Sequence, residues 1–343
     1  MYKRIFKTGK VPSDILRRQV FNRVGAPTHR VLSGPSVGED AAVIEMGDRV
    51  LVAKGDPITG AERKIGWLSV HINANDIAST GARPLWFVCI ILLPDGADES
   101  MLETIMSDIQ EACLEVGVAL VGGHTETTPG LDRPILAGFM MGEAQRNGYI
   151  TTSGAKPGDL IILTKGAGIE GTAVIAHDLR DHLKGKVEDQ VVKRGAAMMS
   201  SISVVPEAMK AIESGSPNSL HDPTEGGVLN GLWEMAEAAG VGLRIEKNSI
   251  YIREETKQIC EALGVDPLKL LGSGALIITA ERCETEKIIE ALTEMGVKAS
   301  VIGEVATLSE GRFLVDKRGN YETIEAVEQD ELYRILEELN EAS

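Results

Sequence analysis

The sequence predicts an α+β protein of two domains. The chain has 343 residues, which is more than one ordinary domain holds and about the length of two. In both halves, apolar runs typical of strands alternate with amphipathic stretches typical of helices. The pattern restarts near residue 150, where residues 156–159 (KPGD) predict a turn before a new strand. We therefore expect one domain over residues 1–150 and a second over residues 151–343.

In the first half, turn residues and apolar periodicity set the expected elements. Gly47-Asp48 predicts a hairpin between two short strands, and Gly81 and Gly117 each predict the end of a helix. The apolar run from Leu85 to Leu93 predicts a buried strand. We expect helices over residues 12–24, 62–80 and 101–116, and strands over residues 41–46, 50–54, 85–93, 118–121 and 134–141.

The second half has the same mixture of elements. Gly240 predicts the end of a helix that begins at Glu225. Leucines at helical spacing in the acidic tail, residues 321–343, predict a solvated amphipathic helix. We expect strands over residues 160–164, 241–246, 275–279 and 297–305, and helices over residues 170–180, 188–213, 225–239, 253–263 and 284–296.

Composition narrows the class of protein. The formal net charge is −16, and a chain this acidic repels phosphate backbones, so we expect no nucleic-acid partner. The longest apolar run is nine residues, whereas a membrane-spanning helix needs about 20, so we expect no membrane span. No apolar signal core follows Met1, and the four cysteines show no metal-binding spacing. These features predict a soluble cytoplasmic protein.

Acidic residues beside glycines are the strongest functional signal. Asp40 follows Gly38 at the start of a strand, Asp56 follows Gly55 at the end of the next strand, and Asp76 lies near the end of a helix. Carboxylate oxygens suit Mg²⁺, and glycines let backbone N–H groups approach phosphate oxygens. Five segments share this character: residues 38–42 (GEDAA), 54–57 (KGDP), 75–76 (ND), 122–126 (GGHTE) and 222–227 (DPTEGG).

Each segment also has an ordinary structural interpretation. Asp222 with Pro223 and Glu225 matches a helix-capping sequence, and residues 38–40 could form a solvated turn. His124 by itself is more often a loop histidine than a ligand. Asp76 fits such an interpretation less well, because a carboxylate near a helix C-terminus faces the negative end of the helix dipole. The sequence contains neither a GxxxxGK[ST] motif nor a GxGxxG motif at a strand–helix junction, so any nucleotide site has another architecture.

Taken in order, the segments resemble the PurM-like superfamily of aminoimidazole ribonucleotide (AIR) synthetase. Residues 38–43 (GEDAAV) resemble its G-D-D-A-A-V segment, and residues 75–84 (NDIASTGARP) resemble N-D-x-x-x-x-G-A-x-P. Residues 122–125 (GGHT) resemble G-G-[EDH]-T. Residues 222–227 resemble D-P-T-R-G-G of the hydrogenase-maturation HypE branch. The resemblance covers residues 30 to 310.

The resemblance implies a fold, cofactors and site residues. It implies an N-terminal mixed half-barrel sheet with helices, a C-terminal α/β sandwich, ATP and Mg²⁺ in the cleft, and a homodimer formed by the N-terminal domains. Carried over by position, Asp40, Asp56, Asp76 and Asp222 are the expected metal ligands. Asp56, Asp76 and His124 are the expected catalytic residues. The expected cofactor-binding residues are Lys10, Gly38, Asp40, Asn75, Gly122, Gly123, Thr125, Asp222 and Thr224.

The implied activity is ATP-dependent phosphorylation of an oxygen on a small molecule or on an amide or carbamoyl acceptor. Two alternatives remain open: a non-catalytic nucleotide-binding assembly protein, and a kinase similar to thiamine-monophosphate kinase. Departures from the family pattern favour a diverged substrate. The tail lacks the cysteine that HypE proteins modify, Gly55 replaces a metal-adjacent Thr or Ser, and His124 stands where an acid is usual. Self-modification of a C-terminal cysteine is therefore not expected.

Overall fold

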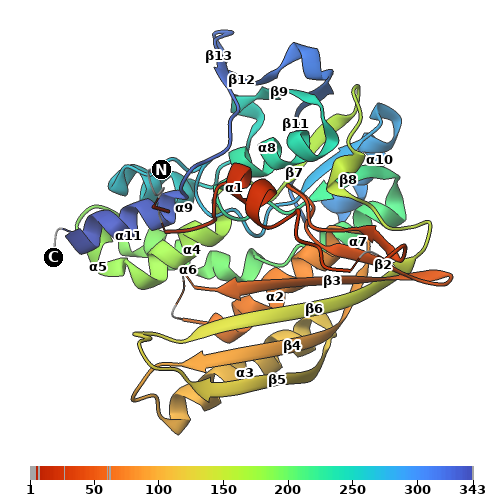
Figure 1. Cartoon of the computed structure of the whole chain (residues 1–343). Coiled ribbons are helices and arrows are strands. Elements are labelled where there is room, and N and C mark those ends of the chain that lie inside the picture. The colour runs from red at the N-terminus through yellow and green to blue at the C-terminus, as the bar shows by residue number, and fades with distance from the viewer. Residues whose placement is uncertain (1–4, 7, 27, 60, 62, 342–343) are drawn as a thin grey trace.

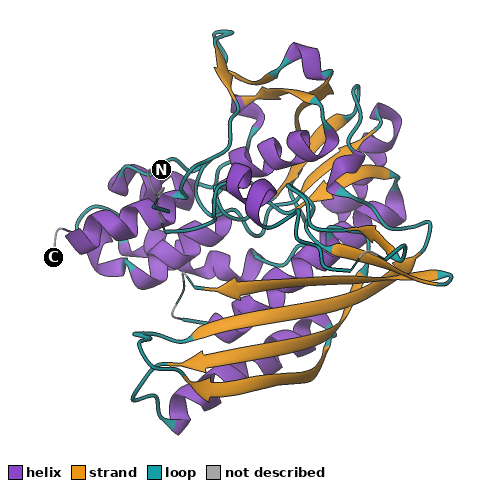
Figure 2. Cartoon of the chain, in the orientation of Figure 1, coloured by secondary structure: helices purple, strands orange, loops and turns teal. Residues whose placement is uncertain are grey.

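A computed structural model describes residues 5, 6, 8–26, 28–59, 61 and 63–341. Each half of the chain builds one β-sheet with its own helices, and Figure 1 shows the two halves packed against each other. Strands and helices alternate along much of the chain, and Figure 2 shows that both halves contain helices as well as strands. The α+β class expected from the sequence is therefore confirmed. Among the described residues, no helix is long and apolar enough to cross a membrane.

The first sheet has six strands in the order β1-β2-β3-β6-β4-β5. Its neighbouring strands are antiparallel except β4 and β5, which are parallel, so the sheet is mixed as expected. The strands are β1 (Val31–Ser33), β2 (Ala42–Met46), β3 (Arg49–Ile58), β4 (Arg83–Leu93), β5 (Ala119–Thr127) and β6 (Ile135–Gln145).

Two helices pack on one face of this sheet. In β4 alternate residues are buried, and Phe87 and Ile91 belong to the core beneath α2 (Ile65–Ala78) and α3 (Glu99–Val116). All fourteen residues of α2 are buried, because the helix lies among the sheet, α3 and α7 (Val205–Ser214) of the second half. Asp98 caps α3 by accepting a hydrogen bond from the Met101 amide, and Gly117 ends it at a φ of 79°. This burial fixes Asp76, near the end of α2, at the boundary between the halves.

The second sheet has seven strands in the order β13-β12-β9-β11-β7-β10-β8, all antiparallel except the β9–β12 pair. The strands are β7 (Leu160–Thr164), β8 (Pro217–His221), β9 (Gly242–Glu246), β10 (Ile277–Ala280), β11 (Ala299–Ala306), β12 (Arg312–Val315) and β13 (Tyr321–Thr323). The helices are α4 (Ile169–Asp178), α5 (Arg180–Leu183), α6 (Asp189–Ala197), α7 (Val205–Ser214), α8 (Gly227–Ala239), α9 (Glu254–Leu263) and α10 (Arg282–Glu294).

The two ends of the described chain lie beside the junction of the halves. Helix α1 (Ser13–Gln19) lies against the second half through an ion pair of Arg17 with Glu237 on α8. Helix α11 (Glu331–Glu341) buries Leu332 and Ile335 in the same core as the first sheet. The tail helix expected from the sequence is therefore present, but one of its faces is buried rather than solvated.

Several expected elements differ from the structure. The helix expected over residues 188–213 is two helices, α6 and α7, because the chain turns at residues 198–204 before Pro206 begins α7. Strands β8, β12 and β13 were not expected. The expected strand over residues 118–121 is longer, since β5 continues through Gly122 and Gly123 to Thr127. The expected helix over residues 62–80 begins at Ile65, and Glu62 lies outside the described residues.

Candidate functional site

Three aspartates that are far apart in the sequence converge at the junction of the halves. Asp40 precedes β2, Asp76 is on α2, and Asp222 follows β8. One carboxylate oxygen from each lies within 4.8 Å of the others. Asp76 and Asp222 are each only 2% exposed. The fold therefore gathers three carboxylates in a place that water barely reaches.

The chemistry of this cluster fits a divalent cation. Asp76 Oδ2 and Asp222 Oδ2 are buried and have no hydrogen-bond partner among the described residues. Burial raises the pKa of Asp222 to about 8, and the Asp40 carboxylate adds to the effect. Burial also raises the pKa of Asp76 well above its ordinary value, and Lys54 only partly opposes this. Oxygen ligands are those that Mg²⁺ prefers, and a bound cation would reverse the repulsion among the three groups.

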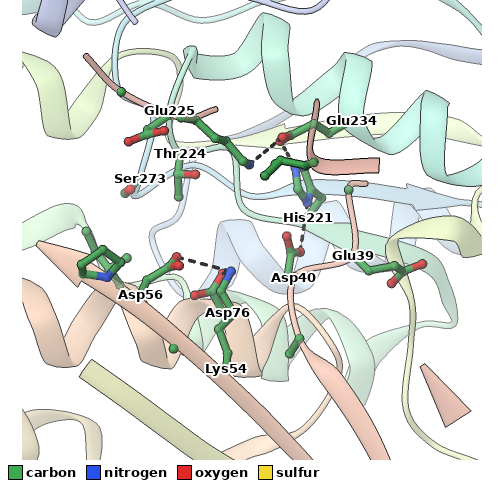
Figure 3. Close-up of a pocket in the computed structure, with 18 of the residues that line it drawn as sticks. Glu39, Asp40, Lys54, Asp56, Asp76, His221, Thr224, Glu225, Glu234 and Ser273 are labelled. Carbon is green, nitrogen blue, oxygen red and sulfur yellow. Dashed lines mark hydrogen bonds and ion pairs between the residues drawn. The ribbon is translucent and has the colours of Figure 1, made fainter. Parts of the chain in front are cut away.

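Asp56 reaches this cluster through a lysine. Lys54 Nζ lies 3.3 Å from Asp56 Oδ2 and 3.2 Å from Asp76 Oδ1, as Figure 3 shows. Both Lys54 and Asp56 are on β3, where residues two apart point to the same face of the sheet. Burial alone would lower the pKa of Lys54, but Asp76 and the other aspartates outweigh it and raise the pKa well above its ordinary value. Asp56 is therefore linked to the cluster by an ammonium group.

A second chain of ion pairs leads from the cluster to Lys10, near the N-terminus. His221 Nδ1 lies 2.9 Å from Asp40 Oδ2, and its Nε2 lies 3.3 Å from Glu234 Oε2. Lys10 Nζ completes the chain at 2.8 Å from Glu234 Oε1. Burial alone would raise the pKa of Glu234, but Lys10 and His221 lower it to about 2. These contacts hold Lys10 beside Glu234, in the cavity that Asp40 and Asp76 also line.

All of these groups except Asp222 line one cavity of about 720 Å³ between the halves. Gly38, at a φ of +81°, passes so close to α8 that a Cβ would lie 2.5 Å from the Glu234 carbonyl oxygen. Thr224 lies on the opposite wall from Asp56 and Asp76 in Figure 3. The cavity has room for a nucleotide-sized ligand. The sequence-predicted residues Lys10, Gly38, Asp40, Asp56, Asp76 and Thr224 all line it.

One other predicted residue, Asn75, lies in different surroundings. The Asn75 side chain donates to the Ile202 carbonyl (2.9 Å) and accepts from the Val204 amide (2.8 Å), so it fastens α2 to the second half. Glu39, which was not predicted as a site residue, lines the cavity, and its carboxylate accepts hydrogen bonds from the backbone amides of Thr152 and Ser153. Both residues hold the halves together beside the aspartate cluster.

The glycine-rich segment that includes His124 lies apart from the cavity. Gly122, Gly123, His124 and Thr125 are exposed residues of β5, the end strand of the first sheet, and none of them lines the cavity. His124 Nε2 lies 3.2 Å from Glu126 Oε2 on the same strand. Within one chain, the structure does not bring this segment to the aspartates.

The capping interpretation of Asp222 is wrong. Helix α8 begins after Gly226, and Asp222 lies in the preceding loop, where its carboxylate accepts a hydrogen bond from the Ser79 hydroxyl at 3.0 Å. The positive φ of both Gly226 (78°) and Gly227 (63°) lets the chain turn between Asp222 and the helix. Asp222 is thus free to face Asp40 and Asp76.

Sequence reasoning did not single out several residues that line the cavity. Lys54 belongs to the predicted segment 54–57 and His221 precedes the predicted segment 222–227, so their position was a usable signal. Glu170 and Glu234 are acidic residues within apolar helical stretches, a pattern that also indicates a buried functional carboxylate. Ser273, Leu332 and Tyr333 carry no signal in the sequence, because only the folded chain brings them to the cavity.

The fold and the acidic cavity place the protein in the PurM-like class. The family described as AIR synthase related protein, N-terminal domain, matches residues 38–144, and its C-terminal domain counterpart matches residues 156–316. The chain therefore belongs to the AIR synthase related family. Within that family its similarity is to the HypE branch.

Named relatives agree with this placement. A putative hydrogenase expression/formation protein of Methanocaldococcus jannaschii is 28% identical over 86% of this chain and 88% of its own length. The hydrogenase expression/formation protein HupE of Azotobacter chroococcum is 32% identical over 70% of this chain and 69% of its own. A carbamoyl dehydratase HypE of Azotobacter vinelandii is 30% identical over 73% of this chain and 72% of its own.

Solved structures confirm the two-domain PurM-like fold. HypE in a HypE–HypF complex superposes with a TM-score of 0.75 at 24% identity, covering 91% of this chain and 99% of that one. HypE in complex with ATP gives a TM-score of 0.72 at 24% identity, covering 95% and 98%. At this identity the likeness supports the fold alone.

Proposed function

We propose that the protein is an ATP- and Mg²⁺-dependent enzyme that phosphorylates an oxygen of an amide, carbamoyl or other small-molecule acceptor. The observation that carries the proposal is the convergence of Asp40, Asp76 and Asp222, with two buried oxygens that lack partners. The relatives named carbamoyl dehydratase support the same chemistry, and a HypE with the same fold forms a complex with ATP.

The residues have distinct tasks in this proposal. Asp40, Asp76 and Asp222 would hold Mg²⁺, which would supply positive charge to neutralise the phosphates of ATP. Lys54, held between Asp56 and Asp76, adds a fixed positive charge where negative charge develops. The backbone at Gly38 allows close approach, and Lys10 and Thr224 contribute polar groups at the cavity wall. Residues 1–150 would supply most of this machinery, and residues 151–343 would close the cavity with Asp222, Thr224 and His221.

We also propose that the protein is a homodimer joined through the first sheet. Every residue of β5 is exposed, and Leu120, Val121 and Phe139 leave 41%, 53% and 43% of their surface to solvent. An end strand with exposed apolar side chains is an open edge that soluble proteins usually cover. Pairing of two copies of the protein through their first sheets would bury this face. It would also let Gly122, Gly123, His124 and Thr125 of one copy contribute to the nucleotide site of the other.

Phosphate transfer from ATP to a panel of acceptors tests the proposed activity. The panel would hold carbamoyl phosphate, primary amides and thiamine monophosphate, each with labelled ATP and Mg²⁺. Phosphate release that depends on an amide or carbamoyl acceptor supports the proposal. Transfer of the labelled phosphate to thiamine monophosphate, with ADP formed, favours the kinase alternative, and tight ATP binding without transfer or release favours the assembly protein.

A further inference from the structure

Asp56, the fourth aspartate expected to bind metal, does not belong to the aspartate cluster. The oxygens that lie within 4.8 Å of one another come from Asp40, Asp76 and Asp222. The backbone at Asp56, on β3, is fixed by Asn73 of α2, which is fully buried. Asn73 Oδ1 accepts from the Asp56 amide at 2.9 Å, and Asn73 Nδ2 donates to the Asp56 carbonyl at 3.2 Å. The packing of the sheet on α2 therefore sets the place of Asp56 beside the cluster.

Two members of the cluster keep a buried oxygen for a ligand, and Asp56 does not. Asp76 turns Oδ1 to Lys54, and Asp222 turns Oδ1 to the Ser79 hydroxyl. Oδ2 of both aspartates is buried without a hydrogen-bond partner among the described residues. The Asp56 side chain is 34% exposed, and neither of its oxygens is both buried and unpartnered among these residues. The demand for a cation therefore comes from the cluster and not from Asp56.

The ammonium group of Lys54 lies where a second cation would bind. Its Nζ is 3.3 Å from Asp56 Oδ2 and 3.2 Å from Asp76 Oδ1, and Figure 3 shows it between the two carboxylates. A Mg²⁺ shared by these carboxylates would lie about 2.1 Å from the same oxygens. It would compete with Nζ for them, and the two positive charges would repel each other strongly in a poorly solvated site. A second divalent cation could bind there only if the lysine left.

The charges around the cluster also favour a single divalent cation. One divalent cation and the Lys54 ammonium would offset most of the charge of the four aspartates, whereas two divalent cations beside the same ammonium would exceed it. Lys10 is the other lysine that lines the described cavity, and its Nζ is engaged by Glu234 at 2.8 Å. Lys54 is thus the lysine placed to serve Asp56 and Asp76.

We propose that the Lys54 ammonium replaces a second divalent cation, so that the site binds one divalent cation per chain. Asp56 is then a positioning residue, which holds Nζ beside Asp76 and does not coordinate metal. The Lys54–Asp56 pair restricts the divalent cation to the oxygens of Asp40, Asp76 and Asp222. The assignment deepens the proposed function and rests on it, because it assumes the same cation cluster and specifies how many cations the protein holds.

Counting bound Mn²⁺ tests the proposal without requiring turnover. Mn²⁺ also suits carboxylate ligands, and it would be titrated into the full chain without nucleotide while the free ion is measured by its EPR signal. Lys54→Ser removes the ammonium and offers an oxygen, and Lys54→Arg keeps the charge. Asp56→Asn and Asp222→Asn compare an aspartate outside the cluster with one inside it. Arg49→Ser is the matched control, because Arg49 is on the same strand but is paired with Glu143 outside the cavity.

The wild type, Arg49→Ser and Lys54→Arg should each bind one Mn²⁺ per chain. Lys54→Ser should bind a second ion, and two ions about 4 Å apart should broaden each other's EPR signal. Asp56→Asn should still bind one ion, with less than about a tenfold loss of affinity, whereas Asp222→Asn should lose at least about tenfold.

Three results would overturn the role of Lys54: two ions in the wild type, a single ion in folded Lys54→Ser, or equal losses of affinity in Asp56→Asn and Asp222→Asn. If Lys54→Ser does not fold, the comparison of the two aspartate variants decides. Absence of bound Mn²⁺ from the wild type would instead refute the cation cluster itself, and with it the proposed function.

Discussion

Lys54 and Asp76 form an ion pair on the floor of the cavity, with Nζ 3.2 Å from Oδ1. The lysine comes from β3 and the aspartate from α2, so the pair links the first sheet to the helix that packs on it. In the protein without a bound cation, Lys54 partly neutralises the aspartate cluster beside Asp76, and His221 does so beside Asp40. The effect of removing Lys54 therefore depends on whether a cation is present.

Lys54→Met should destabilise the protein by about 3 kcal/mol in the absence of Mg²⁺, because it leaves buried carboxylates without a cation. Added Mg²⁺ should recover a large part of this loss. Chemical denaturation with and without Mg²⁺ measures both effects. Arg49→Met is the matched control, since it removes an exposed pair with Glu143 and should cost less than about 1 kcal/mol. Equal costs for the two variants would contradict the expected role of Lys54.

Asp222→Asn should abolish stabilisation by Mg²⁺. A ligand that binds only the folded state stabilises it by about 2.7 kcal/mol at a concentration 100 times its Kd. Asp222 contributes one of the three oxygens that lie within 4.8 Å of each other. The melting temperature of the wild type should therefore rise with Mg²⁺ and that of Asp222→Asn should not. Glu143→Gln, away from the cavity, should respond as the wild type does. A full Mg²⁺ response in Asp222→Asn would place the cation elsewhere.

Glu170 should make the stability of the ligand-free protein depend on pH. Burial raises the pKa of its carboxyl group from 4.5 to about 7 in the folded state. Between these values the folded protein binds a proton that the unfolded chain does not, so the free energy of unfolding falls as the pH rises through this range. Relative to Glu170→Gln, the wild type should lose up to about 3 kcal/mol between pH 4.5 and pH 7. Urea denaturation across this pH range measures the free energy of unfolding of both proteins. If that free energy has the same pH dependence in the wild type and in Glu170→Gln, the pKa of Glu170 is not raised.

Val121→Lys should convert the proposed dimer to a monomer. Val121 is 53% exposed on β5, and a charge there would oppose burial of this face. Light scattering at micromolar concentration measures the mass of both proteins. Leu114→Lys, at an apolar position on α3 that is more exposed still (72%), should leave the dimer intact. A wild-type protein that is monomeric under these conditions would contradict the proposed homodimer.

Much of the fold could be predicted from the sequence because local signals agree with the tertiary structure. The apolar run at residues 85–93 is indeed the buried β4, and Gly117 and Gly240 do end α3 and α8. The errors arise where packing overrides local pattern. Strand β8 was missed because Pro217, Asn218 and Ser219 are poor strand formers, yet pairing with β10 places them in the sheet.

The aspartate cluster was predictable for a different reason. Asp40, Asp56 and Asp76 stand beside apolar elements, where an isolated carboxylate is costly, so they were expected to share a ligand, and Asp222 was expected to join them from the family resemblance. In the structure Asp222 takes the third place in the cluster, and Asp56 is connected to it through Lys54. The Lys10–Glu234–His221 chain was not predicted, because its members are separated by up to 224 residues and show no common pattern. Likewise, Asn75 stands next to Asp76 in the sequence, but its side chain faces residues 202–204.

The central claim is that Asp40, Asp76 and Asp222 hold a divalent cation against the phosphates of ATP. Calorimetric titration of ATP, with Mg²⁺ and then with EDTA, into the wild type and Asp76→Asn tests this most directly. We predict tight binding only for the wild type with Mg²⁺, and at least about a tenfold loss either on chelation or in Asp76→Asn. ATP binding of equal strength in all four titrations would contradict the claim.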